Sequence, residues 1–428
     1  MAQANSLWHG MGAMRTLAAI GAALALTIVV AALDAAPASQ PRFPRIYREL
    51  GIALLDEWVT DVDLSADGTR LAYARRDPRD WYLDVWTTRP SGREKACITC
   101  ELPTPTKHRG APIWHPDGEW LFFSAENDDV RTRKADRMAE PATALNTNLW
   151  AVAVGGARAF PLTTFATDYK DPRGVLAPIV APDGKQIAWA GPVDADPVEN
   201  VADKTVKPDQ ESEEANAKGY EWGRWAIYLA DLEIADSTPT LRNIRVLAPA
   251  PHDGFYQVDD WSKDGRRLLI TASPAGGMGL ESLDIYEYDL AAERLRPLTQ
   301  TADWDHHAHY SADGRQVVWS SSRDLNVKFR SVDGLNWRRD VRTELWVMNR
   351  DGSEPRRLTF FNERGHRDHA WFRSRVFRTP RVFVSDNACL LDGTRVAAVL
   401  GYEASAGQLG GVLAVLELNR AAAAKNGE

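Results

Sequence analysis

The sequence repeats one turn six times, and this repetition constrains the fold more than any other feature. Each copy has an apolar residue three positions before an Asp-Gly pair and a short run of alternating apolar residues after it. The six pairs are Asp67-Gly68, Asp117-Gly118, Asp183-Gly184, Asp264-Gly265, Asp313-Gly314 and Asp392-Gly393. Asp-Gly between two strand-like runs is typical of β-hairpins, because glycine accepts the positive φ of such turns. Six aligned copies indicate a repeat protein.

The alternation after each turn predicts that one side of each hairpin is buried. Three positions after each glycine stand Leu71, Leu121, Ile187, Leu268, Val317 and Val396. Two positions further on stand Tyr73, Phe123, Trp189, Ile270, Trp319 and Ala398. A spacing of two places both sets on one face of a strand. Because two more strand-like runs usually follow before the next turn, each repeat is expected to form one blade of a β-propeller.

The sixth repeat ends before a fourth strand, and Tyr47 to Leu55 is a strand-like run without a partner. We expect this run to complete the last blade and to close the ring, which leaves no open sheet edge. The expected fold is therefore all-β, a six-bladed β-propeller over residues 39–420. The expected blades lie near 59–100, 110–163, 176–248, 255–299, 306–360 and 381–420 plus strand 47–55.

The N-terminus reads as a secretory signal over residues 1–38. An uncharged apolar stretch from Thr16 to Leu33 follows Arg15, and small residues suited to cleavage stand near Ala36 and Ala38. An uncleaved anchor is the alternative, since the stretch nearly has the length of a membrane span. A periplasmic or secreted protein is expected, with a short polar tail at 421–428.

Three cysteines occur, at Cys97, Cys100 and Cys389. In an oxidising compartment Cys97 and Cys100 are expected to form a local disulfide, whereas in a reducing one the pair could be redox-active or half of a metal site. No second pair is present to complete a zinc site. Cys389 occupies an apolar position of the repeat and is expected to be buried.

The net charge of -8 argues against nucleic acid as the main partner, because phosphate binding needs a basic face. Polar insertions at 124–148, 192–219 and 323–342 lengthen the repeats unevenly. The second insertion is strongly acidic, which is typical of a mobile loop rather than of a calcium site.

The repeats resemble those of the TolB-type propeller family, whose core reads Trp-Ser-Pro-Asp-Gly, as in WD40-like repeats. Glu344 to Thr359 and Asp313 to Ser320 match most closely, and the resemblance covers roughly Tyr47 to Asn419. It departs at His115, which replaces Ser, and at Lys263, which replaces Pro. The resemblance implies a six-bladed propeller. TolB has a separate α/β domain before its propeller, but the short span between the expected signal and the first blade favours a propeller alone here. Peptidases with a related propeller carry a Gly-x-Ser-x-Gly elbow, which this sequence lacks.

Histidines and acids gather where the chain enters the inner strands, beside the expected central channel. On a regular strand His307 and His309 point to one face and His306 to the other, so at most two of the three could share a ligand. The candidate residues at the channel mouth are Asp259, Asp260, Asp305, His306, His307, His309, His366 and His369. Polar residues that merely line a water-filled channel are the simpler interpretation.

Two functions follow from this pattern. The first is a monomeric, non-catalytic binding or scaffold module without a cofactor, with an envelope protein, a peptide or a glycan as partner. The second is a metal-dependent, glycan-active enzyme, since the sequence also resembles oligogalacturonate lyases, which have a seven-bladed propeller and a histidine-bound metal. The six repeats counted here depart from that blade number. The candidate ligands of a divalent ion are His307 and His309, with His366 or His369, or Asp259 and Asp260, to complete the set.

Overall fold

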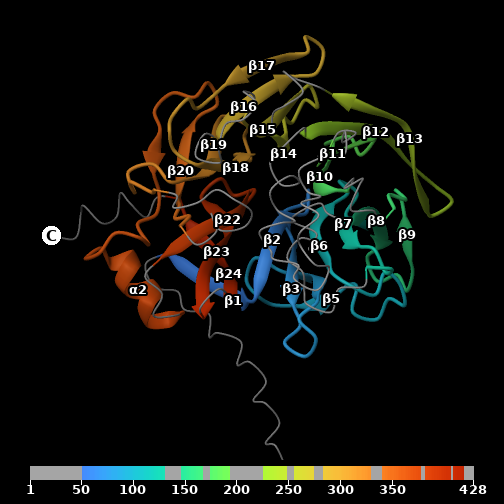
Figure 1. Cartoon of the computed structure of the whole chain (residues 1–428), viewed down its shortest axis with the longest axis horizontal. Coiled ribbons are helices and arrows are strands. Elements are labelled where there is room, and N and C mark those ends of the chain that lie inside the picture. Colours follow the sequence, from blue (N-terminus) through green and yellow to red (C-terminus); the bar gives the residue numbers. More distant parts are fainter. Residues whose placement is uncertain are drawn as a thin grey trace, which may run out of the picture. The chain divides into compact units, whose positions relative to one another are not determined.

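The computed structural model describes residues 51–130, 146–166, 174–192, 225–247, 255–273, 283–328, 340–376, 381–405 and 408–418. The expected signal peptide (1–38), residues 47–50, the tail (421–428) and most of the three insertions lie outside these ranges. The described residues form six antiparallel sheets of four strands each, arranged as the blades of a propeller (Figure 1). The predicted six-bladed architecture is confirmed.

Blades 1 to 6 follow the order of the six Asp-Gly turns. Blade 1 comprises β2 (Val59–Leu64), β3 (Leu71–Arg76), β4 (Leu83–Thr88) and β5 (Ala96–Cys97). Blade 2 comprises β6 (Arg109–Trp114), β7 (Trp120–Glu126), β8 (Thr147–Ala153) and β9 (Ala159–Pro161). Blade 3 comprises β10 (Leu176–Val180), β11 (Gln186–Pro192), β12 (Trp225–Ala235) and β13 (Thr238–Leu247). Blade 4 comprises β14 (Phe255–Trp261), β15 (Arg267–Ser273), β16 (Asp284–Asp289) and β17 (Arg294–Pro297). Blade 5 comprises β18 (Asp305–Tyr310), β19 (Gln316–Ser321), β20 (Glu344–Asn349) and β21 (Arg356–Arg357). Blade 6 comprises β22 (Val382–Cys389), β23 (Arg395–Ser405), β24 (Gln408–Glu417) and the N-terminal strand β1 (Ile52–Glu57).

The Asp-Gly turns join the first and second strands of every blade, as predicted. All six glycines have φ between 67° and 73°, a region in which a side chain is strained. In blade 4 the Gly265 amide donates to the Ser262 carbonyl at 2.8 Å. The Asp264 carboxylate accepts from the Arg266 amide at 3.1 Å and from the Ser262 hydroxyl at 2.6 Å. These turns therefore serve the fold, because the turn aspartate accepts hydrogen bonds from donors within its own turn.

The first strand of each blade lies innermost, and the six inner strands β2, β6, β10, β14, β18 and β22 contact one another in a closed circle (Figure 1). Each inner strand loses register with the second strand of its blade near its middle. In blade 5, for example, His306 pairs with Ser320 and His309 with Val318, so two residues oppose Trp319. This is a β-bulge, which redirects side chains on the inner strand.

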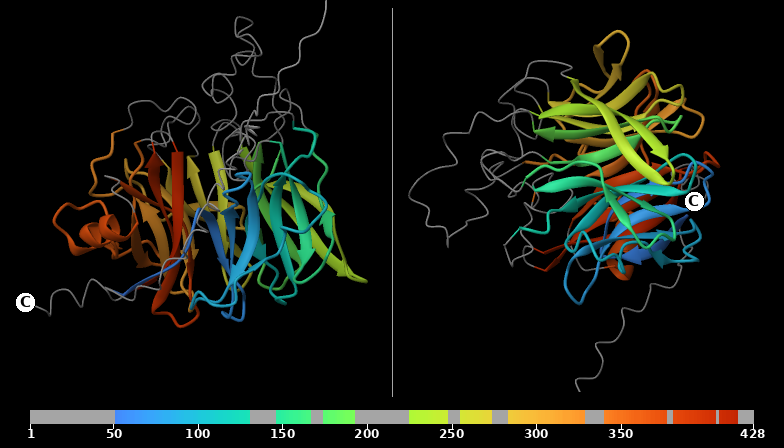
Figure 2. Two further views of the ribbon diagram at one scale, coloured as in Figure 1. Left: turned by 90° about the horizontal axis from the view of Figure 1, so that it is seen from below. Right: turned by 90° about the vertical axis from the view of Figure 1, so that its right-hand side faces the viewer.

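The core lies between neighbouring blades, since both faces of each sheet are apolar. Leu269 and Ile285 of blade 4 are buried against Val317 and Trp319 of blade 5 in one hydrophobic cluster. The two side views show the sheets standing next to one another around the ring (Figure 2). Each blade consequently depends on its two neighbours to cover its faces.

Strand β1 closes the ring by pairing with β24, as predicted. The register runs from Ile52 opposite Leu416 to Glu57 opposite Val412. Ile52 and Leu54 join the cluster shared with blade 5, and Leu55 joins the cluster shared with blade 1. The N-terminal strand therefore fills both interfaces of the last blade.

A helix between blades 5 and 6 was not expected from the sequence. Helix α2 (Arg367–Arg375) begins at His366, whose side chain caps the Asp368 amide, and it buries Trp371 and Phe372. Cys389 is only partly buried, contrary to the expected full burial, although it packs against the same cluster. In the described part of the chain, no helix has both the length and the apolarity of a membrane span.

Deleting residues 1–57 is expected to lower the melting temperature by about 10 °C or more. Ile52, Leu54 and Leu55 are at most 3% exposed, and burial of each such side chain contributes about 1.5–3 kcal/mol. Thermal unfolding followed by circular dichroism measures the effect. A deletion of residues 1–50, which keeps β1, is the matched control and should melt like the full chain; equal melting of both variants would contradict ring closure by β1.

Candidate functional site

Two positions of each inner strand, counted back from the turn aspartate, can be compared across the six blades. Four residues before the turn aspartates stand Asp63, Ile113, Ile179, Asp260, His309 and Ala388. Six residues before them stand Asp61, Ala111, Ala177, Val258, His307 and Asp386. Blades 2 and 3 carry only apolar side chains at both positions, whereas blades 4, 5, 6 and 1 each carry at least one acid or histidine. The ionisable residues therefore come from four consecutive blades of the ring.

We name five of these residues the axial cluster: Asp63, Asp260, His307, His309 and Asp386. His309 is at its centre. Its Nδ1 lies 3.9 Å from Oδ2 of Asp260, and its Nε2 lies 3.5 Å from Oδ1 of Asp386. The imidazole ring thus bridges the carboxylates of blades 4 and 6, which flank blade 5.

His307 contacts the same carboxylate from the bulge of β18. Its Nδ1 lies 3.6 Å from Oδ1 of Asp386. Its φ of 50° places the backbone in the left-handed region, and Ala111 and Ala177 adopt similar angles at the same position of blades 2 and 3. The side-chain amide of Asn387 donates to the His307 carbonyl at 2.7 Å and holds this strained segment against blade 6.

The cluster carboxylates also tie neighbouring inner strands together. Asp63 accepts from the Trp114 amide at 2.7 Å, Asp260 from the Tyr310 amide at 2.9 Å, and Asp386 from the Val62 amide at 2.8 Å. Each bond joins one blade to the next. Removing such an acceptor would leave a backbone N–H without its partner, which typically costs about 1–3 kcal/mol.

Protein surrounds the cluster, yet solvent reaches its side chains, which are 32% exposed in Asp260, 21% in His309 and 12% in Asp386. Burial raises the pKa of Asp63 to about 7 and also raises the pKa of Asp260. Burial opposes the charge of His309, but the Asp386 hydrogen bond and the Asp260 carboxylate raise its pKa to about 9. His309 is therefore an imidazolium ion at neutral pH.

The pKa values of Asp386 and His307 are lowered, in contrast to the raised pKa of His309. Burial favours the neutral form of Asp386, but the hydrogen bond from His309 and the nearby positive charge hold its pKa below the usual value. Burial and the neighbouring His306 hold the pKa of His307 well below its usual value. The cluster consequently pairs a cationic and a neutral histidine with one ionised carboxylate between them.

Three other predicted residues lie on the same strands but are not members of the axial cluster. Asp259 is buried, and it accepts from the Thr271 hydroxyl at 2.6 Å and from Gln257 at 3.1 Å. Asp305 is fully buried and accepts from Nε1 of Trp319 at 2.9 Å. The ring of His306 contacts the rings of Trp304 and His307, and burial lowers the pKa of His306 to about 3.

His366 and His369 belong to helix α2, which lies at the outer edge of the propeller (Figure 1). His366 caps that helix, and Nδ1 of His369 lies 2.7 Å from the Phe361 carbonyl. Within the described residues, the structure brings neither of them into contact with His307 or His309. Their contacts are those of a helix packed on the side of blades 5 and 6.

Sequence reasoning missed Asp63 and Asp386. Both stand at the two repeat positions that carry His307, His309 and Asp260, counted back from the turn aspartates. Comparing those positions across all six copies would have found them. Attention to histidine-rich runs alone favoured residues that are near in sequence over residues that are near in space.

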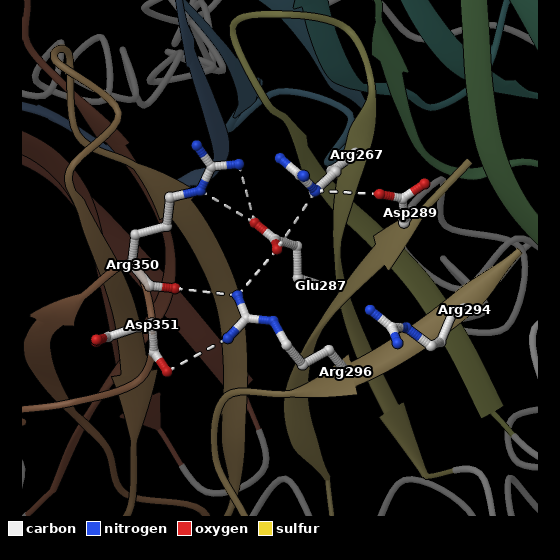
Figure 3. Close-up of a pocket in the computed structure, with 7 residues that line it drawn as sticks. All are labelled: Arg267, Glu287, Asp289, Arg294, Arg296, Arg350 and Asp351. Carbon is white, nitrogen blue, oxygen red and sulfur yellow. Dashed lines mark hydrogen bonds and ion pairs between the residues drawn. The ribbon is translucent and has the colours of Figure 1, made fainter. Parts of the chain in front are cut away.

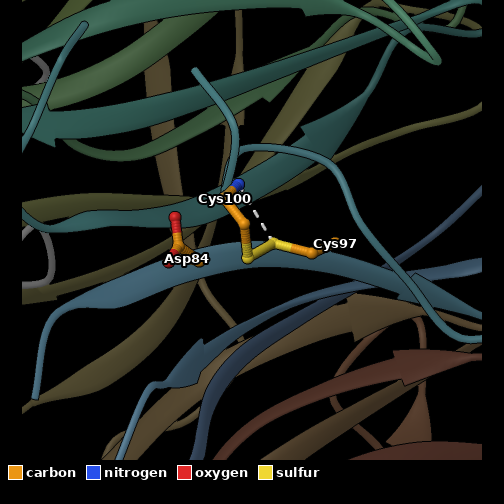
Figure 4. A group of neighbouring side chains, drawn as sticks. All are labelled: Asp84, Cys97 and Cys100. Carbon is orange, nitrogen blue, oxygen red and sulfur yellow. Dashed lines mark hydrogen bonds between the residues drawn. A yellow bond between two sulfur atoms is a disulfide. The ribbon is translucent and has the colours of Figure 1, made fainter. Parts of the chain in front are cut away.

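Cys97 and Cys100 form a disulfide with an S–S distance of 1.97 Å beside Asp84 (Figure 4). Asp84 pairs with Nη1 of Arg109 at 2.7 Å. In the described part of the chain, these three residues are also the group whose potential metal-ligand atoms all lie within 4.8 Å of one another. Because the two sulfur atoms are bonded to each other, neither is a thiolate, and the group does not fit a metal ion.

Replacing Asp386 with Asn is expected to lower the pKa of His309 from about 9 toward its usual value. Asn keeps an acceptor for the Val62 amide but removes the charge. Because the raised pKa stabilises the fold below about pH 6.5 and this stabilisation is lost as pH rises through about 9, the variant should also lose less stability across that window.

NMR titration of the imidazole protons measures the pKa, and urea unfolding at several pH values measures the stability. Asp392→Asn changes an exposed carboxylate on the Asp-Gly turn of the same blade and is the matched control. An unchanged His309 pKa in Asp386→Asn would contradict the assigned ion pair.

No protein-family model matches the sequence. Solved structures with a similar fold include a protein described as TolB from Agrobacterium tumefaciens, with 19% identity, 74% of this chain and 76% of that chain covered, and a TM-score of 0.42. TolB from Acinetobacter baumannii is 13% identical, with 81% of this chain and 63% of that chain covered and a TM-score of 0.45. An oligogalacturonate lyase in complex with manganese is 12% identical, with 86% of this chain and 93% of that chain covered and a TM-score of 0.47.

At these identities the likeness concerns the fold alone, and propellers of one fold serve many functions. The strand pairing and the closed circle of inner strands define the fold of this chain directly. The protein is a six-bladed β-propeller whose ring is completed by its N-terminal strand.

Proposed function

We propose that this protein is a binding module that takes a basic segment of a partner protein or peptide at its axial cluster. One observation carries the proposal: the carboxylates of Asp260 and Asp386, whose side chains are 32% and 12% exposed, flank His309 from the two neighbouring blades. A lysine or arginine side chain of a partner could pair with these carboxylates. Charge-assisted hydrogen bonds of this kind are stronger than neutral ones.

The charge balance of the cluster favours a cationic partner over an anionic one. His309 supplies one positive charge, and its two ring nitrogens already face Asp260 and Asp386. An anionic ligand would therefore compete with these carboxylates for a single imidazolium. A cationic ligand instead gains attraction from both carboxylates and from Asp63, which is partly ionised near neutral pH because burial raises its pKa to about 7.

A bacterial envelope or secreted location fits this proposal. The N-terminal apolar stretch has the pattern of a secretory signal. The Cys97–Cys100 disulfide is of a kind that persists mainly in oxidising compartments. The partner is accordingly sought among proteins and peptides outside the cytoplasm.

Asp260→Asn combined with Asp386→Asn is expected to weaken binding of a lysine-rich peptide by about tenfold or more. Both substitutions keep shape and a carbonyl acceptor but remove charge. Fluorescence anisotropy with labelled lysine-rich, glutamate-rich and serine-glycine peptides measures the affinities. The wild-type protein should prefer the lysine-rich peptide.

The matched control is Asp313→Asn combined with Asp392→Asn, which removes two charges from exposed turns. If this control weakens binding equally, the attraction comes from net charge and not from the axial cluster. A preference for the glutamate-rich peptide, or binding of neutral oligosaccharides alone, would refute the proposed partner chemistry.

The alternative is a metal-dependent, glycan-active enzyme, and His307 is the observation in its favour. Its pKa lies well below the usual value, so its imidazole is neutral and could ligate a metal. A divalent ion at His309 would have to displace the ring proton that the carboxylates of Asp260 and Asp386 stabilise. The axial side chains are also absent from the group of close ligand atoms in the described residues.

Elemental analysis of purified protein separates the two functions. For the binding module we expect no stoichiometric manganese or zinc that depends on the axial histidines, so wild type and the His307→Ala, His309→Ala double variant should hold equal amounts. Stoichiometric metal in the wild-type protein that is lost in the double variant would favour the enzyme. His366→Ala, on helix α2, controls for adventitious binding by surface histidines.

A further inference from the structure

Four arginines converge on a hollow of about 500 Å³ beside blades 4 and 5, which we name the arginine pocket (Figure 3). It is lined by Arg267, Glu287, Asp289, Arg294, Arg296, Arg350 and Asp351. These residues come from the ends of β15, β16 and β17 and from the turn after β20. The pocket is therefore distinct from the axial cluster, which lies on the inner strands.

Glu287 stands at the bottom of this arrangement, with only 7% of its side chain exposed. Its carboxylate accepts from Nη2 of Arg296 at 2.9 Å, from Nε of Arg350 at 3.1 Å and from the Tyr310 hydroxyl at 2.8 Å. Nε of Arg267 lies 3.7 Å away. One buried anion thus gathers three guanidinium groups.

The propeller does not need a carboxylate at this place. Glu287 pairs with Leu269, four residues after the turn glycine. At the equivalent place the other five blades carry Thr87, Ala151, Leu229, Val347 and Val415. Those blades pack on their neighbours with small or apolar side chains. Glu287 and its arginines are consequently an addition to the repeat, and local departures from a repeat often mark function.

The arginines outnumber the anions that face them. Asp351 directs its carboxylate to the amide and hydroxyl of Ser353 in its own turn, and only its carbonyl faces Arg296. Asp289 binds Arg267 but also two amides of its turn. Arg294 lines the hollow and has no side-chain ion pair or hydrogen bond within the described part of the chain (Figure 3).

One bidentate arginine is enough to neutralise one buried carboxylate. The four arginines of the pocket therefore have more N–H donors than its carboxylates can accept. The side chains of Arg267, Arg296 and Arg350 are 34 to 40% exposed, so solvent reaches these guanidinium groups, although Nη2 of Arg350 is itself buried beside Glu287. Planar guanidinium groups recognise carboxylates and phosphates by paired hydrogen bonds. The volume of the hollow suits a small molecule.

We propose that the arginine pocket binds a small polyanion that carries at least two carboxylate or phosphate groups. Glu287 holds Arg296 and Arg350 in place, and Arg294 supplies an uncommitted charge to the ligand. Citrate and inorganic pyrophosphate serve as the two probes, since they present the same charge through carboxylates and through phosphates.

Isothermal titration calorimetry of the full chain with each probe measures the affinity of the pocket. Two substitutions are expected to change this affinity in opposite directions. Arg294→Gln should weaken binding about tenfold, because it removes a charged donor that makes no contact within the protein. Glu287→Gln should strengthen binding several-fold, because it removes the resident anion that competes for the same guanidinium groups while preserving side-chain size.

Each variant has a control of equal charge change on the exposed turn of blade 5, namely Arg315→Gln and Asp313→Asn. Both controls should bind like the wild-type protein. The proposal is overturned if neither probe binds at millimolar concentration, if the controls match the pocket variants, or if only a glutamate-rich peptide binds. Asp260→Asn with Asp386→Asn should leave citrate and pyrophosphate binding unchanged, so this test fails or succeeds independently of the axial cluster.

Discussion

The structure depends on the burial of both faces of every four-stranded sheet. A sheet with one solvated face could stand alone at an edge, but here apolar side chains point toward both neighbours, as in the cluster that joins Leu269 to Trp319. An open row of such sheets would expose an apolar face at each end. Only closure removes both ends. Strand β1 completes this closure, and the first strand of the described chain is thus held by the last.

Closure also creates the axial cluster. Inner strands that are far apart in sequence become neighbours, and the bulges turn their side chains toward one axis. Asp63, Asp260 and Asp386 then have two roles, because each accepts a backbone N–H of the next blade while facing His309 or its surroundings. A substitution that removes the whole side chain would therefore confuse stability with binding. Asn is the informative replacement, since it changes charge and little else.

The repeat provides an internal reference that a single-copy fold lacks. Six structurally equivalent positions show which residue types the blade itself requires, and a departure from them calls for another explanation. His309 departs from the isoleucines of blades 2 and 3, and Glu287 departs from the small or apolar residues of five other blades. Both departures place ionisable groups where the architecture is satisfied without them, at a cost in desolvation that their partners offset.

Much of the fold could be predicted from the sequence, because its determinants are local. Asp-Gly at each turn, apolar alternation after it and a strand left over at the N-terminus were sufficient for six blades and their closure. Helix α2 was not predicted, since its helical pattern is short and mixed with charged residues.

The candidate site was only partly predictable, because its geometry is not local. The sequence alone pointed to His307, His309 and Asp260, but also to Asp305, which turns inward to Trp319, and to His366 and His369, which belong to α2. The pairing of His309 with Asp386 joins different blades and arises only when the ring closes. Local pattern determined the blades, and tertiary structure decided which charges meet, because contacts across the axis depend on closure rather than on spacing along the chain.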